Sequence, residues 1–267
     1  MRDIRQNKKY AKYLENQNWL VIEANSVFYY IKKILFFSFI KVQRPKEIRY
    51  DEINSLIKQY KALQIIIEPR TKKEAKKLIN NGWRQTTPFI PSKTLIINLN
   101  KPIRKIFASF RKKTRYSIRK SEKINVHEEK NLAQFRKYWK DSVGFQRPVL
   151  SLKQLKDLKE IFGVDCLFLI AKNGIAGGVF LVAERIGYYW YGFANENGRR
   201  KLAQYQVIWQ GIKWAKIRGA KHFDMEGIYD ERFPLSGWIG FSKFKIGFGG
   251  KIVEYPGAFQ KTTLKIW

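Results

Sequence analysis

The sequence predicts a mixed fold of the α/β or α+β class, because segments typical of strands alternate with segments typical of helices. Residues 63–69, for example, are a β-branched run, and residues 71–83 follow with helical spacing of their apolar positions. The chain has 267 residues, of which 45% are hydrophobic and 15% aromatic. That length and composition allow one large or two small domains, each with a sizeable core.

The first part of the chain reads as a basic helix, three strands, and then two helix–strand alternations. Thr71 stands at the N-cap position of the second full helix, Glu74 completes a capping box and Gly82 ends it. The expected helices are residues 3–17, 51–60 and 71–81, and the expected strands are residues 18–24, 27–31, 34–42, 63–69 and 94–99.

Residues 101–123 form a strongly basic segment that we expect to be helical. One face is apolar, and a second is lined by Arg104, Arg111, Arg115 and Arg119. Cations this dense repel one another along a helix, so the segment either faces an anion or is a solvated basic surface.

The second half begins with two helices, at residues 132–139 and 152–161, and continues as three strands with short turns. Residues 166–171, 177–185 and 187–194 therefore predict an antiparallel meander. A long amphipathic helix over residues 199–219 and a strand over residues 220–227 follow. Strands, a long helix and another strand are the order of an N-acyltransferase core.

Aromatic residues, glycines and two lysines are concentrated in residues 236–257. The alternation at Phe244 and Lys245 predicts a strand, which would place Lys243 and Lys245 on one face. An ammonium beside a glycine-rich bend can stabilise a permanent or developing negative charge. The alternative is a glycine-rich sheet edge guarded by lysines.

The charge balance predicts an anionic partner, since Lys and Arg number 53 against 22 Asp and Glu, a net charge of +31. Nucleic acid, nucleotide-linked substrates and an anionic membrane surface are the candidates.

Cys166 is the only cysteine and is expected to be buried, and two histidines without ligand spacing predict no metal site. Lysines interrupt the apolar segment 27–42 short of the ~20 residues of a spanning helix. Together with the charged N-terminus, this predicts a cytoplasmic protein.

Two features bear on the chemistry of an N-acyltransferase core. The loop before the long helix reads NENGRRKLAQ and has one glycine, Gly198, instead of a glycine-rich pyrophosphate turn, so we expect no coenzyme A and no other cofactor. Asp224 and Glu226 are two apart on the last strand, hence on one face, where Asp224 is a candidate proton acceptor. The alternative is that these carboxylates anchor a loop or pair with lysines.

The chain resembles the Fem (FemABX) family of peptidoglycan aminoacyltransferases in several motifs that occur in the family's order. These motifs are DIRQNKKYAKYLENQNW, IIIEPRTKKEAKKLINNGW, PFIPSKTLIINL, KKTRYSIRKSEK, YYWYGFANENGRR, HFDMEG and GFSKFKIGFGG. The last is the most specific. The resemblance implies two domains similar to the GNAT (N-acetyltransferase) fold, each a mostly antiparallel mixed sheet flanked by helices. It places a shortened first domain at residues 1–98, the second at 99–250 and a return to the first at 251–267.

The resemblance also implies a reaction. Family members move an amino acid from aminoacyl-tRNA to an amine of a UDP-linked or lipid-linked cell-wall precursor peptide, which implies contact with the inner face of the anionic cell membrane. Direct aminolysis creates an oxyanion, which Lys245 is expected to stabilise while Phe244 shapes the site. The expected substrate-binding residues are Tyr191, Arg115, Arg119, Arg147 and Lys243.

One family pattern is missing. The matching text KDSVGF has Lys140 and Ser142 where a Thr and a diphosphate-associated Arg are expected, so Arg147 is the candidate replacement. Two alternatives stay open. One is a GNAT-fold N-acyltransferase with another acyl donor and a small amine or sugar acceptor, and the other is a non-catalytic tRNA-binding module.

Overall fold

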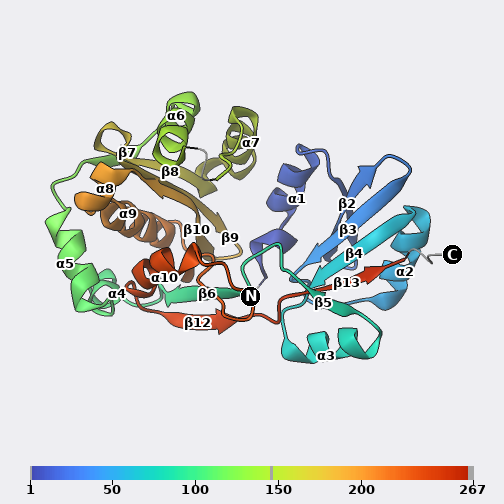
Figure 1. Ribbon diagram of the computed structural model, residues 1–267. Coiled ribbons are helices and arrows are strands. Elements are labelled where there is room, and N and C mark those ends of the chain that lie inside the picture. Colours follow the sequence, from blue (N-terminus) through green and yellow to red (C-terminus); the bar gives the residue numbers. More distant parts are fainter. Residues whose placement is uncertain (1, 145–146, 264–267) are drawn as a thin grey trace. The chain divides into compact units, whose positions relative to one another are not determined.

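A computed structural model describes residues 2–144 and 147–263 of the protein (Figure 1). The chain divides into two compact units. Unit 1 comprises Met1–Lys93, Asp230–Leu235 and Glu254–Trp267, and unit 2 comprises Thr94–Tyr229 and Ser236–Val253. Each unit holds one mixed sheet with flanking helices, which confirms the predicted fold class.

The boundary between the units differs from the predicted one after residue 98. The strand that was assigned to the first domain pairs with Asp224 and its neighbours in the second sheet, so the first unit ends at Lys93. Residues 230–235, expected in the second domain, belong to unit 1.

The sheet of unit 1 has six strands in the order β1-β2-β3-β4-β13-β5. All neighbours are antiparallel except β3 and β4, whose parallel pairing requires the crossover helix α2. The strands are β1 (Leu20–Ala24), β2 (Val27–Ile34), β3 (Phe37–Gln43), β4 (Ala62–Glu68), β5 (Arg84–Thr86) and β13 (Ala258–Thr262). The helices are η1 (Ile4–Gln6), α1 (Lys8–Glu15), α2 (Tyr50–Gln59) and α3 (Lys72–Asn80).

Helices cover both faces of this sheet. Leu56 of α2 and Leu78 of α3 pack with Tyr29 in one core cluster, whereas Tyr10 of α1 lies edge-on to Tyr30 on the opposite face. The neighbouring residues Tyr29 and Tyr30 of β2 therefore pack against helices on opposite faces of the sheet. The predicted capping box of Thr71 in α3 is present.

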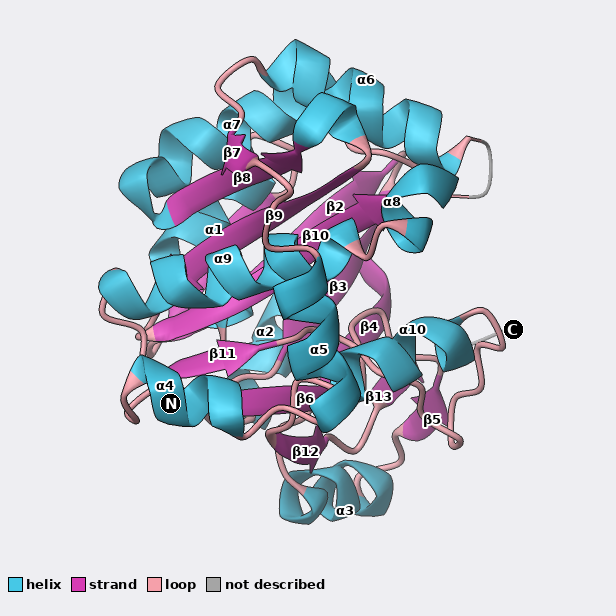
Figure 2. Cartoon of the chain, turned by 90° about the vertical axis from the view of Figure 1, so that its left-hand side faces the viewer, coloured by secondary structure: helices cyan, strands magenta, loops and turns pink. Residues whose placement is uncertain are grey.

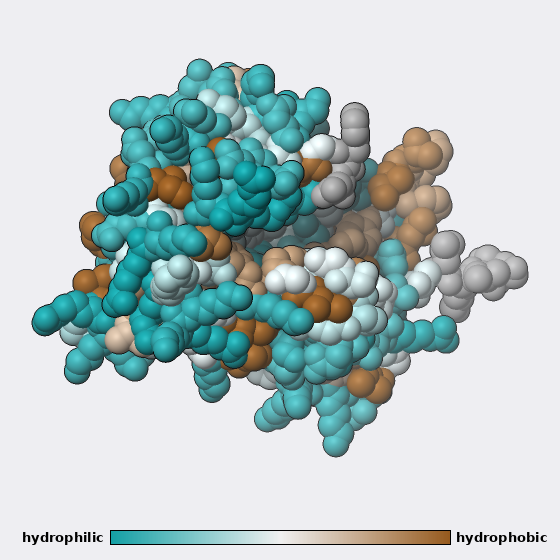
Figure 3. Space-filling model, turned by 60° about the vertical axis from the view of Figure 1, so that its left-hand side comes forward, coloured by the Kyte–Doolittle hydropathy of each residue, from teal (hydrophilic) through white to brown (hydrophobic). Residues whose placement is uncertain are grey.

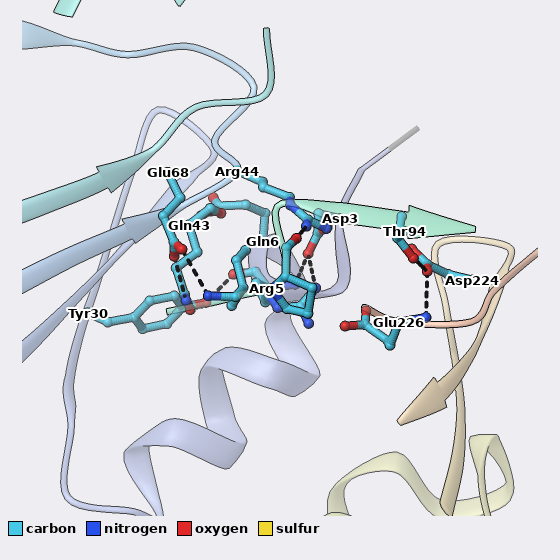
Figure 4. Close-up of polar contacts among 12 residues, drawn as sticks. Asp3, Arg5, Gln6, Tyr30, Gln43, Arg44, Glu68, Thr94, Asp224 and Glu226 are labelled. Atoms are coloured by element: carbon cyan, nitrogen blue, oxygen red, sulfur yellow. Dashed lines mark hydrogen bonds and ion pairs between the residues drawn. The ribbon is translucent and has the colours of Figure 1, made fainter. Parts of the chain in front are cut away.

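A buried polar network ties the N-terminal segment to the sheet of unit 1 (Figure 4). Asp3 forms ion pairs with Arg44 at 2.8 Å and with Arg5 at 3.2 Å. Burial raises the pKa of Asp3, but the two guanidinium groups outweigh it and hold the pKa at about 2. Gln43 donates to Glu68 at 2.9 Å, and burial raises the pKa of Glu68.

The sheet of unit 2 has the order β12-β6-β11-β10-β9-β8-β7. Its centre is the predicted antiparallel meander, and β10 pairs in parallel with β11. The strands are β6 (Lys93–Asn98), β7 (Val126–Glu128), β8 (Cys166–Ala171), β9 (Ala176–Ala183), β10 (Ile186–Ala194), β11 (His222–Asp224) and β12 (Lys251–Glu254). Cys166 is buried as predicted.

Helices α4, α5 and α9 cover one face of this sheet (Figure 2), where Phe110 and Ile208 pack on Phe180 and Phe223 in one core cluster. Phe135 of α6 packs against Phe168 on the other face. The helices are α4 (Ile103–Ala108), α5 (Lys112–Lys120), α6 (Leu132–Val143), α7 (Leu152–Phe162), α8 (Glu196–Arg200), α9 (Ala203–Ile217) and α10 (Trp238–Ile246), with 3-10 turns η2 (Gly163–Asp165) and η3 (Lys172–Gly174). Among the helices of residues 2–144 and 147–263, none has the length and apolar character to cross a membrane.

Three predicted elements are wrong in detail. The basic helix over 101–123 is broken into α4 and α5, because the amide of Arg111 donates to the carbonyl of Gly247 at 2.9 Å instead of continuing α4. The helix over 199–219 is two helices, α8 and α9, separated where Leu202 has a φ of 61°. The strand expected at Phe244 and Lys245 is the helix α10.

Candidate active site

The candidate site lies in unit 2, where β10 and β11 stop pairing. Their parallel register covers only Ile186–Tyr188 against His222–Asp224, although β10 continues to Ala194. An irregularity between Tyr189 and Tyr191 in the pairing with β9 redirects β10 at this point. The backbone after β11 is therefore free to form a loop beside Tyr189.

Helix α10 holds this loop through two side chains on one of its faces. The ammonium group of Lys245 donates to the carbonyl oxygens of Glu226 and, at 2.8 Å, of Gly227. The hydroxyl of Ser242 accepts from the amide of Tyr229 at 2.6 Å. These contacts stabilise a loop in which Glu226 and Gly227 both have positive φ, 46° and 53°.

Lys245 is a buried cation with one donor left for a ligand. Its side chain is buried, and its Nζ lies 4.9 Å from the ring centre of Phe241 and 5.5 Å from that of Tyr189. Of the three N–H groups of an ammonium, two bond the loop, and the third has no hydrogen-bond partner among the residues that the structure describes. Such a donor is able to stabilise an oxyanion.

The pKa of Lys245 is lowered to about 8. Burial lowers it, the carboxylates of Glu226 and Asp224 partly counteract this, and the charge of Arg147 lowers it further. The group stays mostly protonated at pH 7 while giving up its proton more easily than an exposed lysine.

Asp224 anchors the same loop. Its carboxylate accepts from the hydroxyl of Thr94 and from the amide of Glu226 at 2.8 Å (Figure 4), and the side chain is buried. The strand ends at Asp224, so the expectation that Glu226 shares its face is wrong. This geometry matches the loop-anchor alternative rather than a base that moves protons.

The structure separates the other residues expected around Lys245. Phe244 points into the core, where its ring lies 4.7 Å from that of Tyr205, and it is Phe241 that lies beside the ammonium. Lys243 is exposed, and because α10 is a helix it does not share a face with Lys245. Tyr191 is half-buried against Trp139, with ring centres 5.1 Å apart.

Two of the three expected arginines bond backbone carbonyls. Arg147 donates to the carbonyl of Gly192 on β10 at 2.5 Å, close enough to Lys245 to affect its pKa. Arg115 bonds the carbonyl oxygens of Phe110 and, at 3.2 Å, Ala108, and so stabilises the break between α4 and α5. Arg119 is exposed and lies 5.5 Å over the ring of Phe107.

The exposed cations of α4 and α5, together with Arg111 at the N-cap of α5, form a surface that we call the basic face. None of them forms a salt bridge with a carboxylate of the described residues, so their charge is available to an anion. The basic face consists of Arg104, Lys105, Arg111, Lys112, Lys113, Arg119 and Lys120.

The loop where coenzyme A users have a pyrophosphate turn is wound into helix α8. Asn195 caps this helix by accepting from the amide of Gly198 at 2.9 Å. A Cβ on Gly198 would lie 2.0 Å from the carbonyl oxygen of Ile175, so this glycine is required for close packing. The single glycine has a structural role here.

Two further polar groups of the site, Ser242 and Gln204, carry no signal in the sequence. Ser242 was not recognised because a lone serine between aromatic residues carries no pattern. Gln204 on α9 donates to the hydroxyl of Tyr189 at 2.6 Å and to Gly177 at 3.2 Å, and its own buried carbonyl oxygen has no partner among the described residues. Within those residues no cluster of metal-ligating side chains is present.

Residues 170–266 match the family model described as FemAB family. No curated protein sequence matches the chain. The fold is similar to that of the crystal structure of FemX, with a TM-score of 0.79 and 15% identity over 97% of this chain and 92% of that one. It is also similar to L-PGS from Bacillus licheniformis (TM-score 0.63, 12% identity, 94% and 86% covered) and to a GCN5-related N-acetyltransferase from Sphaerobacter thermophilus (TM-score 0.50, 9%, 88% and 76%). The predicted GNAT-like fold is confirmed, and the resemblance to the Fem family is confirmed over residues 170–266.

Proposed function

We propose that this chain, whose residues 170–266 carry the FemAB family signature, is an aminoacyltransferase that uses aminoacyl-tRNA as donor. In the form we favour, the acceptor is an amine on the peptide of a peptidoglycan precursor, either UDP-linked or lipid-linked. The observation that carries the proposal is the buried ammonium of Lys245, which has one uncommitted N–H where β10 and β11 separate.

The reaction is a direct aminolysis. The acceptor amine attacks the ester carbonyl of the donor, a C–N bond forms, and the carbonyl oxygen becomes an oxyanion beside Lys245. When the tetrahedral intermediate collapses, the C–O bond to the ribose breaks and the ribose oxygen takes the proton that the amine releases. One well-placed donor to the oxyanion contributes ~10²–10³ in rate.

Other residues support binding in this proposal. The unpartnered carbonyl oxygen of Gln204 accepts an N–H of the amine, and Tyr191 lines the acceptor path. Arg147, whose charge reaches Lys245, attracts the phosphates of the precursor. The basic face, together with Lys243, binds the tRNA backbone, which fits the net charge of +31. No cofactor is required.

A lipid acceptor is the second candidate, because L-PGS and the C-terminal domain of a putative lysylphosphatidylglycerol synthetase from Agrobacterium fabrum share the fold, both with a TM-score of 0.63. In that case a lipid hydroxyl replaces the amine as nucleophile and the product is an ester.

The test is to incubate the protein with a pool of charged tRNAs and one acceptor at a time, then measure product mass. The acceptors are UDP-linked muropeptide, lipid-linked muropeptide and phosphatidylglycerol. A gain of one or more aminoacyl masses on a muropeptide supports the first form, and a gain on the lipid alone supports the second. No gain on any of the three refutes the aminoacyltransferase.

A further inference from the structure

The hairpin between β2 and β3 exposes four consecutive large apolar residues, Ile34 to Phe37, which we call the hairpin tip. Their exposed fractions are 58% for Ile34, 92% for Leu35, 84% for Phe36 and 44% for Phe37. The surface in Figure 3 is mostly hydrophilic, and hydrophobic residues gather in a few patches, one of which projects at the upper right. On an ordinary protein surface, exposed apolar residues are scattered singly, so four adjacent ones are unusual.

The residue types in the turn are not those that favour the formation of a hairpin. Ile34 pairs with Phe37, so Leu35 and Phe36 are a two-residue loop. Leu35 has a φ of 52°, a conformation that such loops normally give to Gly or Asn. A bulky residue is strained there, and a glycine would stabilise the turn. An exposed residue whose type disfavours its own backbone conformation is typical of a functional position.

The strand segments on both sides of the hairpin tip are basic. No Asp or Glu occurs in residues 24–46 or 53–67. Lys32 and Lys33 immediately precede the tip, and the exposed Lys61 is linked to its far side through the bond from the amide of Ser38 to the carbonyl of Lys61 at 3.3 Å. Lys32 donates to the carbonyls of residues 17 and 18, so its stem is held beside the sheet.

Aromatic residues continue the apolar surface behind the tip. The ring of Phe39 contacts the rings of Trp19 and Phe89 at centroid distances of 6.3 Å and 5.7 Å, and Phe89 is 59% exposed. Aromatic rings bordered by lysines are typical of groups that lie at the headgroup level of a bilayer.

We propose that the hairpin tip is a membrane anchor that inserts into the interface of an anionic bilayer. Apolar side chains enter the boundary between headgroups and acyl chains, and the lysines around them bind acidic headgroups. A second copy of this chain is a poorer occupant, because two lysine-rich hairpin tips would face each other. The proposal is independent of the transfer reaction, since it concerns unit 1 alone.

The test uses the chain's single, buried cysteine. Burial raises the pKa of Cys166 to about 12, so this thiol does not compete for labelling. A Phe36→Cys variant is labelled with an environment-sensitive fluorophore and mixed with vesicles of phosphatidylcholine alone or with 30 mol% phosphatidylglycerol (roughly the charge density of an anionic leaflet). The matched control is Ile217→Cys, at a residue of unit 2 that is also 84% exposed.

The expected result is a blue-shifted, stronger emission from the position 36 label with anionic vesicles and little change from the position 217 label. In vesicle sedimentation of the unlabelled protein, Leu35→Ser combined with Phe36→Ser should weaken binding at least about tenfold. Equal responses at both positions, or sedimentation unchanged by the double substitution, would overturn the proposal. So would a position 36 response that depends on protein concentration without vesicles, which would indicate self-association.

Discussion

Replacing Lys245 by methionine tests the proposed chemistry most directly, because it removes the ammonium and keeps an unbranched apolar stem. The structure indicates two separate losses. The carbonyls of Glu226 and Gly227 lose their donor, which at ~1–3 kcal/mol for each unsatisfied buried acceptor predicts a destabilisation of about 2–6 kcal/mol. The transfer rate should fall ~10²–10³-fold if the third N–H stabilises the oxyanion.

A second variant separates these losses. Ser242→Ala removes the other tether of the loop, its bond to the amide of Tyr229, but leaves the ammonium in place. We expect it to lower the free energy of unfolding by ~1–3 kcal/mol and to keep most of the activity. Lys251→Met, at an exposed lysine of the same unit, controls for the loss of one charge.

The measurements are urea unfolding and single-turnover transfer from charged tRNA. If Ser242→Ala loses as much activity as Lys245→Met, Lys245 acts only through the loop. A folded Lys245→Met protein with the wild-type transfer rate would refute the role of the ammonium altogether.

The pKa of Lys245 adds a pH test. Because the pKa is about 8 in the folded protein and 10.5 in the unfolded chain, the unfolded chain binds more protons between these values. The contribution of Lys245 to stability therefore rises from pH 8 to pH 10.5, and the rise should be absent in Lys245→Met. If the ammonium is the active form, the transfer rate should fall as the pH rises through about 8, after correction for spontaneous ester hydrolysis.

Three further predictions concern other parts of the chain. Gly198→Ala should destabilise the protein by ~1–3 kcal/mol because its Cβ would overlap the carbonyl of Ile175, and unchanged urea unfolding would contradict the packing role. Asp3→Asn should cost ~2–3 kcal/mol at pH 7, a difference from wild type that shrinks as the pH falls from 4 towards 2, because the paired carboxylate of the wild type becomes protonated over this range. Equal acid sensitivity of the two proteins would show that the ion pairs contribute nothing. Lys112→Gln should reduce the slope of log K against log salt for tRNA binding by about 1, whereas an unchanged slope would exclude this lysine from the RNA contact.

Most elements of the fold could be predicted because their signals are local. Thr71 and Glu74 specify a helix start within four residues, and the β-branched runs around residues 27–42 specify two strands. The break at Leu202 could not be predicted, since nothing in its neighbours requires a left-handed residue. The break before Arg111 depends on the carbonyl of Gly247, more than 130 positions away.

The helix α10 was missed although a signal was present. The alternation at Phe244 and Lys245 is too short to define a strand, whereas the aromatic residues at 238, 241, 244 and 248 are spaced as on a helix. Reading this spacing would have separated Lys243 from Lys245 and turned Phe244 towards the core.

Within the candidate site, the sequence predicts the residue Lys245 but not the groups that surround it. Lys245 was singled out by its motif, but its partners are the backbone carbonyls of a loop that begins 19 positions earlier. Backbone groups carry no sequence signal, so neither these bonds nor the resulting pKa could be read from the residue types. The same holds for Asp224, whose partner Thr94 is 130 positions away.

The place of β13 in the middle of the first sheet has a consequence for synthesis. β13 pairs with both β4 and β5, yet among the strands of the described residues it is translated after all the others. Until residue 262 has left the ribosome, β4 and β5 have no partner on that side and expose edges prone to wrong pairing. Unit 2, by contrast, is complete at residue 253. The sheet of unit 1 therefore cannot be completed before all of unit 2 has been translated, in contrast to the usual N-to-C order of multidomain proteins.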